Sequence, residues 1–248
     1  MGRRLVVARK LRAADPVADL KRRIARAPRA IRRLTHAWWQ DHGFAEQIAS
    51  AGTAEVGKRV GIILIKQRSE QLKRAGMVVL GELVGEHLHT LDLEAFGSLL
   101  HDGHIAEPAL VEAFATRVLG KLLERSEIRA NTIYDLARWR HGERAWQRHA
   151  MCLAFLGLAP RAREVPGLTE MICAICASVV WSIDEIDQRA VGRLLRELSE
   201  CEPDRVEEFF HRYCRFMSKA CARTVVSRYA PDRRDKLLAH HKRATTIT

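Results

Sequence analysis

Hydrophobic residues recur along this chain at intervals of three, four or seven positions, with polar and basic residues between them. One stretch places Val17, Leu20, Ile24, Ile31 and Leu34 on one face of a helix and arginines on the other. This is the period of an amphipathic helix, and the two-residue alternation of a half-buried strand is absent. The pattern therefore predicts an all-α protein.

Proline, glycine and small polar residues divide this pattern into separate helices. Ser69 has the character of a capping residue, and Pro108 follows Glu107 where the first turn of a helix tolerates proline, because the amide there has no partner. Gly57 and Gly61 are expected to weaken the start of one helix. The helices predicted on this basis cover residues 17–38 with a kink at Pro28, 45–49, 69–88, 107–124, 132–139, 145–158, 166–180, 184–200, 203–219 and 231–242.

Four segments repeat the same order of a small residue, an apolar stripe and a basic edge. Leu-Gly pairs end three of them at Gly81, Gly120 and Gly157, and the fourth reaches its Leu-Leu pair at Leu195, so the steps are 39, 37 and 38 residues. A period of about 40 residues is typical of stacked helix pairs of HEAT or armadillo type, in which no pair buries its apolar face without a neighbour. We therefore expect a HEAT/armadillo-like α-solenoid.

Composition predicts a folded protein that is neither secreted nor embedded in a membrane. At 248 residues and 47% apolar content, the chain is long enough for a continuous core and is not of disordered composition. No apolar run approaches the roughly 18 residues needed to cross a bilayer, and the N-terminus lacks the apolar region of a secretory signal. Six cysteines, with Cys173 and Cys176 inside an apolar run, are typical of reduced core residues. We expect a cytoplasmic protein with no membrane partner.

The net charge of +12 comes from the two ends of the chain. Residues 1–35 hold 12 Lys and Arg against two acidic residues, and residues 223–248 hold 7 against two, which leaves a small acidic excess between them. Such a positive field favours a polyanion such as nucleic acid. Two other interpretations stay open at this point: arginines that only keep the protein soluble, and an organelle transit segment at the N-terminus.

The second half of the chain carries a more specific pattern. Trp139 and Trp146 precede a segment that ends at Ala150, the sequence 189–197 reads Arg-Ala-Val-Gly-Arg-Leu-Leu-Arg-Glu, and Glu202-Pro203 opens the next helix. This resembles the C-terminal half of the HEAT-like alkylpurine DNA glycosylases of the bacterial DNA alkylation repair family. The resemblance covers about residues 69–242, which favours a basic N-terminal helical segment at 1–68 and a HEAT-like repeat domain at 69–248. Such motifs identify a scaffold before they identify an activity.

The resemblance implies hydrolysis of the N-glycosidic bond of cationic N3- or N7-alkylated purines, with no metal or organic cofactor. The catalytic aspartate of the family aligns with Glu112, a family Arg aligns with His149, and a family Trp aligns with Arg193. A carboxylate stabilises the oxocarbenium-like sugar of such a reaction. Glutamate is one methylene longer, and a misplacement on the order of 1 Å can lower a rate about a hundredfold. The alternative is that Glu112 is an exposed helix residue paired with Arg117 or with solvent.

The expected partner is double-stranded DNA, alkylated or distorted, held in a concave groove formed by the second helices of the repeats and associated with the nucleoid. Contacts from basic side chains would reach phosphates and read few bases. The residues expected in this groove are Arg144, Arg148, His149, Arg189 and Arg193, with Trp139 and Trp146 as wall or packing residues. Two alternatives stay open: structure-specific DNA binding without catalysis, and a HEAT-repeat scaffold for an unknown protein partner.

Two further groups of residues have the residue types of a metal or redox site. His87, His89, His101 and His104 lie close in sequence, but His87 and His89 would point apart on a helix. Cys173 and Cys176 have CxxC spacing, yet their neighbours are apolar and no second such pair exists. We therefore expect no metal site.

Overall fold

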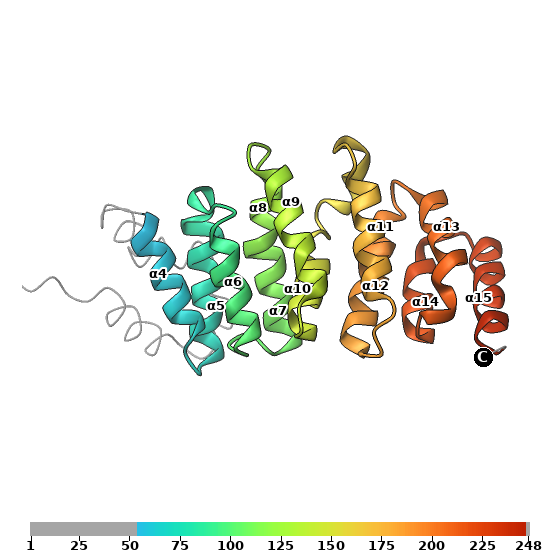
Figure 1. Ribbon diagram of the computed structural model, residues 1–248, viewed down its shortest axis with the longest axis horizontal. Helices are drawn as coiled ribbons and strands as arrows, with labels where there is room; N and C mark the ends of the chain where they lie inside the picture. Colours follow the sequence, from blue (N-terminus) through green and yellow to red (C-terminus); the bar gives the residue numbers. More distant parts are fainter. Residues whose placement is uncertain (1–53, 247–248) are drawn as a thin grey trace, which may run out of the picture.

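The computed structural model describes residues 54–246, and within that range every regular element is a helix. The predicted all-α class is therefore confirmed for the described residues. The helices expected at 17–38 and 45–49 lie outside them. Figure 1 shows the α-helices following one another along the long axis of the molecule, from α4 at one end to α15 at the other. Neighbours in sequence are thus neighbours in space.

The helices have the following bounds. The α-helices are α4 (Ala54–Ile65), α5 (Glu70–Val78), α6 (Asp92–His101), α7 (Pro108–Phe114), α8 (Gly120–Glu124), α9 (Arg129–Ala137), α10 (Ala145–Ala154), α11 (Leu168–Val179), α12 (Glu185–Leu198), α13 (Pro203–Tyr213), α14 (Lys219–Val225) and α15 (Pro231–Thr246). Two π-helical turns, η1 (Val79–Leu83) and η3 (Ala115–Leu119), continue α5 and α7. Short 3₁₀ turns are η2 (Gly85–His87), η4 (Arg138–His141), η5 (Ala159–Glu164), η6 (Cys214–Phe216) and η7 (Val226–Arg228).

Most helix starts agree with the sequence prediction, and two helices were missed, α6 and α14. α7 begins at Pro108 after an extended Glu107, as expected for proline in a first turn. α6 was not predicted at all. The single helix expected at 203–219 is wrong, because Met217 is extended and Ser218 starts a new helix by accepting a hydrogen bond from the Cys221 amide.

Alternate helices along the chain form one continuous row. α5 contacts α7, α7 contacts α10, α10 contacts α12, and α12 contacts α14. We call these five the second-helix row. The repeated segments of the sequence fall on its first four members, since they include α5 with η1, η3 after α7, α10 and α12. The repeat in the sequence is therefore a repeat of one structural position.

One of the repeated glycines allows two members of the row to approach closely. A Cβ on Gly81 would lie 2.3 Å from the carbonyl oxygen of Arg117 in η3, so it would collide with the next element of the row. Gly192 of α12 lies outside the repeated Leu-Gly pairs, and a Cβ there would make only a tight contact, 3.3 Å from the carbonyl oxygen of Cys221. Gly157 differs, because a Cβ there would meet no atom within 4 Å. The recurring glycine thus serves close packing at some repeats and not at others.

The core runs along the whole stack. Four phenylalanines spread along the described residues are fully buried, and Phe96 of α6 packs edge-to-face on Phe114 of α7 with ring centroids 5.6 Å apart. The four are Phe96, Phe114, Phe155 and Phe210. All six cysteines are free thiols. None of the helices in residues 54–246 combines the length and apolar character required for a membrane span.

Candidate nucleic-acid interface

The predicted catalytic residue Glu112 forms a two-pronged ion pair with Arg193. The Arg193 guanidinium donates from Nη1 to Oε2 at 2.9 Å and from Nη2 to Oε1 at 2.8 Å. Glu112 lies on α7 and Arg193 on α12, and α10 packs against both of those helices. The pair therefore joins two members of the second-helix row across the one between them. It is open to solvent, with side-chain exposures of 46% for Glu112 and 28% for Arg193.

Arg193 fixes the charge of Glu112. Its hydrogen bonds hold the pKa of the Glu112 carboxyl below the ordinary value, against a smaller opposing effect of burial. Both carboxylate oxygens are engaged with a cation, so the group is ionised but largely neutralised. Arg117, the alternative partner for Glu112, pairs with Glu82 instead at 3.3 Å.

His149 of α10 lies beside this ion pair. Its side chain is buried, its Nδ1 lies 2.9 Å from the Ile186 carbonyl oxygen, and its ring packs edge-on against Trp146. Burial lowers the pKa of His149, and the nearby charge of Arg193 lowers it further. The imidazole is therefore neutral at pH 7, with Nδ1 as the donor to Ile186 and Nε2 left as an acceptor.

Arg148, the neighbour of His149, holds α10 to α12. Its Nε and Nη2 donate to Oδ2 of Asp187 at 2.9 and 2.6 Å, and its Nη1 donates to the carbonyl oxygens of Gly142 and Glu143. Asp187 is fully buried. This arrangement ties the guanidinium to its own protein, and the phosphate contact predicted for Arg148 stays a prediction.

Two predicted phosphate contacts are free of such ties. Arg144 occupies the residue position just before α10, without a capping hydrogen bond from its side chain, and Arg189 lies one turn before Arg193 on α12; both are exposed. Neither side chain has a hydrogen-bond or ion-pair partner within residues 54–246. Arg189 and Arg193 share a helix face because they are four residues apart. This face of the row thus offers cations to solvent.

The two tryptophans divide between different surroundings. Trp146 is half-buried and lies against His149, with ring centroids 5.9 Å apart, so it belongs to the same cluster. Trp139 is buried in η4 and lines a separate hollow with Leu93 and Gln147. The structure therefore gathers Glu112, Trp146, His149 and Arg193 and leaves Trp139 elsewhere.

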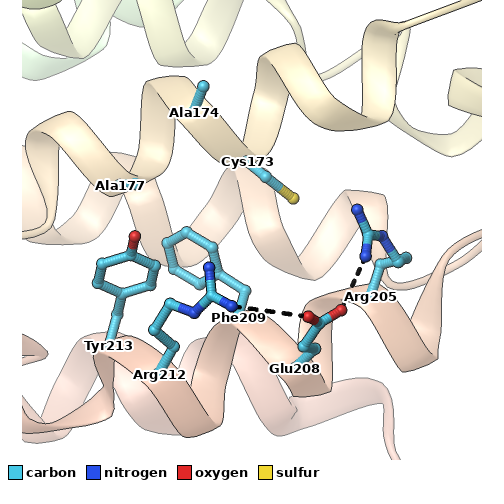
Figure 2. A pocket seen from close by; sticks show the side chains of 8 residues that line it. All are labelled: Cys173, Ala174, Ala177, Arg205, Glu208, Phe209, Arg212 and Tyr213. Carbon is cyan, nitrogen blue, oxygen red and sulfur yellow. Dashed lines mark hydrogen bonds and ion pairs between the residues drawn. The ribbon is translucent and has the colours of Figure 1, made fainter.

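A hollow between α11 and α13 is lined by charged side chains that pair with one another. Figure 2 shows Glu208 between two arginines of α13, paired with Arg205 at 2.8 Å and with Arg212 at 3.8 Å. Burial raises the pKa of Cys173, on the facing helix, to about 11, so this thiol is not a nucleophile at neutral pH. The hollow is about 210 Å³ in volume, and each charged side chain that lines it has an ion-pair partner.

Sequence reasoning missed the acidic partners that organise this region. Asp184 and Asp187 precede or begin α12, and both contact Arg148. The sequence does show these two acidic residues at a predicted helix start. Carboxylates are common there because they cap the helix and interact favourably with its dipole, so the pattern did not point to a distant arginine. No group of three or more metal-ligating side chains comes together within the described part of the chain.

The comparison with protein families identifies the chain. Residues 21–232 match the model of the DNA alkylation repair enzyme family, and the chain belongs to that family. This confirms the resemblance noted in the sequence and supports a DNA alkylation repair-type function. The match starts well before residue 69, where the sequence suggested a domain boundary. Comparison with curated proteins gives no match.

Proposed function

We propose that this protein binds duplex DNA, alkylated or distorted, along the face of the second-helix row that carries Glu112, Arg189 and Arg193, and that the row is a HEAT-type solenoid. Membership of a DNA alkylation repair family supports a DNA partner. The exposed Arg144 and Arg189 supply the sequence-independent attraction of phosphates. A cytoplasmic location at the nucleoid goes with this proposal.

The observation that carries the proposal is the ion pair between Glu112 and Arg193. A solvent-exposed ion pair contributes only about 0–1 kcal/mol, so it opens readily when a stronger anion arrives. A DNA phosphate is such an anion, since guanidinium binds phosphate through two parallel hydrogen bonds. Arg193 moves from Glu112 to the backbone, and the carboxylate it leaves regains its full charge beside the DNA.

That exchange prepares Glu112 for excision. The C1′–N bond of a cationic alkylpurine breaks with both electrons going to the base, which departs neutral. The sugar left behind has oxocarbenium character, which the freed carboxylate stabilises. Water adds to C1′ and its proton passes to the carboxylate and then to solvent. No metal or organic cofactor enters this scheme.

Binding without excision is the second candidate function, and the same ion pair favours it when Arg193 stays in place. The charge of Glu112 is then largely neutralised, because the Arg193 guanidinium lies 2.8 Å from its Oε1. The positive charge of Arg193 also opposes the positive charge that develops on the sugar. The protein would then recognise distorted DNA and leave the base in place. The third candidate is a scaffold for a protein partner, in which case DNA would not compete with that partner for binding.

A release assay separates these functions. Methylated duplex DNA is incubated with the protein, with Glu112→Gln and with Glu208→Gln as a matched surface control, and free 3-methyladenine and 7-methylguanine are measured. Excision predicts release by the native protein and by Glu208→Gln only. Binding without excision predicts no release but retention of the duplex. Neither release nor retention would contradict the proposal.

The Glu112→Gln variant also tests the exchange. Removing the carboxylate frees Arg193 and removes a negative charge that faces the phosphates. We expect Glu112→Gln to bind unmodified duplex more tightly than the native protein at the same salt concentration, whereas Arg193→Ala binds more weakly. Equal affinities for all three would contradict the exchange.

A further inference from the structure

Two large apolar side chains stand in solvent on one short loop. The 180–184 loop joins α11 to α12, and it leaves Trp181 with 55% and Ile183 with 99% of its surface exposed. Single apolar residues are normal on a protein surface, but neighbouring ones mark a surface that meets a partner. This loop is therefore a candidate contact surface.

Trp181 belongs to an aromatic stack that extends to the next helix pair. Its ring lies on that of Phe216, with centroids 3.6 Å apart and an angle of 33° between the planes. Phe216 comes from the 214–218 loop, which joins α13 to α14. The guanidinium of Arg215 lies over the Phe216 ring, 4.4 Å from its centroid. The two loops thus build one surface that is both aromatic and cationic.

Buried Gln188 of α12 ties the two loops together. Its Nε2 donates to the carbonyl oxygens of Val180 and Ser182 in the first loop, at 2.6 and 3.0 Å. It also donates to the carbonyl oxygen of Phe216 in the second loop at 3.1 Å, and its Oε1 accepts from the Ser218 amide at 2.9 Å. The backbone of both loops is therefore fixed, and the apolar side chains are held in solvent by the fold.

The starts of α10, α12 and α14 lie along one edge of the second-helix row. Arg148 of α10 reaches Asp184 in the 180–184 loop at 3.4 Å, and the stack of Trp181 on Phe216 joins the loops before α12 and α14. Exposed cations outnumber exposed carboxylates at these starts. The cations are Arg144, Arg189, Arg215, Lys219 and Arg223, and the carboxylates are Glu143, Asp184 and Glu185. Apolar side chains on a positive edge favour a polyanionic partner.

The length of α12 places this edge beside the proposed DNA interface. The helix has 14 residues and is therefore about 21 Å long, close to the diameter of duplex DNA. A duplex that lies along the second-helix row crosses α12 from end to end. Arg189 then meets its backbone, and the 180–184 loop borders the same duplex.

We propose that the 180–184 loop is a wedge, which inserts Ile183 between two base pairs of the bound duplex while Trp181 stacks on the base that this exposes. Apolar wedges of one or two side chains open base steps in this way, and an aromatic face accepts any base. A protein partner fits less well, since an ordinary interface has roughly 20–30 residues a side. The proposal rests on the proposed function, because it requires a duplex on the row.

The wedge predicts a preference for DNA that is already unstacked, because opening a paired step costs energy. Duplexes that carry 2-aminopurine, a base whose fluorescence rises when it is unstacked, serve as probes, one fully paired and one with a single-nucleotide bulge. The native protein should raise the fluorescence and prefer the bulged duplex. Trp181→Ala should lower that preference about tenfold, the effect of one lost base–aromatic stack. Ile183→Ser should abolish the rise in fluorescence.

Two matched variants are the controls. Leu91→Ser and Tyr134→Ala change exposed apolar residues of α6 and α9 surroundings, away from the 180–184 loop, and should behave like the native protein. Circular dichroism checks that each variant folds, and sedimentation velocity measures self-association.

The outcomes separate the wedge from the proposed function. Duplex binding without a rise in fluorescence, or a rise that Ile183→Ser leaves unchanged, would overturn the wedge and leave the proposed function standing. Absence of any duplex binding would overturn both. Self-association of the native protein that Ile183→Ser removes, with DNA binding unaffected, would assign the surface to a second copy of this chain and so also overturn the wedge.

Discussion

Arg148 and Asp187 form a buried ion pair in which only one carboxylate oxygen is satisfied. Both hydrogen bonds from Arg148 reach Oδ2, at 2.9 and 2.6 Å. Oδ1 is buried and accepts no hydrogen bond from the described residues. Arg148 supplies both side-chain hydrogen bonds that Asp187 accepts, and a buried carboxylate that loses its partner is strongly disfavoured.

This dependence predicts the effect of removing the arginine. Arg148→Ala should lower the free energy of unfolding by about 3–5 kcal/mol, because it strands the charge of Asp187. The double variant Arg148→Met with Asp187→Leu should recover most of that loss, since apolar residues of similar volume often replace a buried pair. Urea denaturation measures the free energy of unfolding of the native protein, the single variant and the double variant. A change no larger than that of Arg144→Ala, at the exposed helix start, would contradict this role.

The repeated glycines predict unequal responses to the same substitution. Gly81→Ala places a methyl group 2.3 Å from the Arg117 carbonyl oxygen and should destabilise by about 1–3 kcal/mol through overpacking. Gly157→Ala meets no atom within 4 Å and should be neutral or stabilising by up to about 1 kcal/mol. Thermal unfolding of the two variants provides the comparison. Similar melting temperatures would mean that close packing is not the reason for Gly81.

The buried His149 predicts a pH dependence of stability. Its folded-state pKa is lowered from the ordinary value of 6.5, chiefly by burial, so the unfolded chain takes up a proton first as the pH falls. The contribution of His149 is therefore fully present above about pH 6.5 and decreases below it. Its charged neighbours are Glu112, Asp187, Arg189 and Arg193.

Urea titrations at pH 8, 6.5 and 5.5 test this contribution with His149→Gln as the reference. The native protein should lose more stability than the variant on acidification. Glu112 contributes in the same direction but below its ordinary pKa of 4.5, outside this range. Equal losses of unfolding free energy in the two proteins would show that the pKa of His149 does not differ between the folded and unfolded states.

The helical period and the repeat were enough to predict the class and most helix starts. Pro108 after Glu107 shows why, because proline is favoured in the first turn of a helix for reasons that depend only on the local backbone. Residues 203–219 show the limit. Their apolar pattern is continuous, but α13 ends at Tyr213, η6 follows, and a new helix starts after the extended Met217 and the Ser218 cap. This break is held by hydrogen bonds from Ser218 and Gln188, which periodicity does not report.

The site was predictable in part for a similar reason. The resemblance located Glu112, His149 and Arg193 by position, and the structure brings them together. It gave no sign that Glu112 and Arg193 are partners, because 81 residues separate them and the pairing depends on how α7 and α12 flank α10. The role of Asp187 likewise comes from packing between α10 and α12.

The salt dependence of duplex binding tests the proposed DNA interface most directly. Fluorescence anisotropy over a range of salt concentrations gives the slope of log affinity against log salt for the native protein, Arg189→Ala and Arg205→Ala. Arg205 is a matched control because it is an exposed arginine on α13, outside the second-helix row. We predict that Arg189→Ala lowers the magnitude of the slope by about 0.9, the value for one lost phosphate contact, and that Arg205→Ala leaves it unchanged. Equal slopes for all three proteins, or a drop only in Arg205→Ala, would contradict the account.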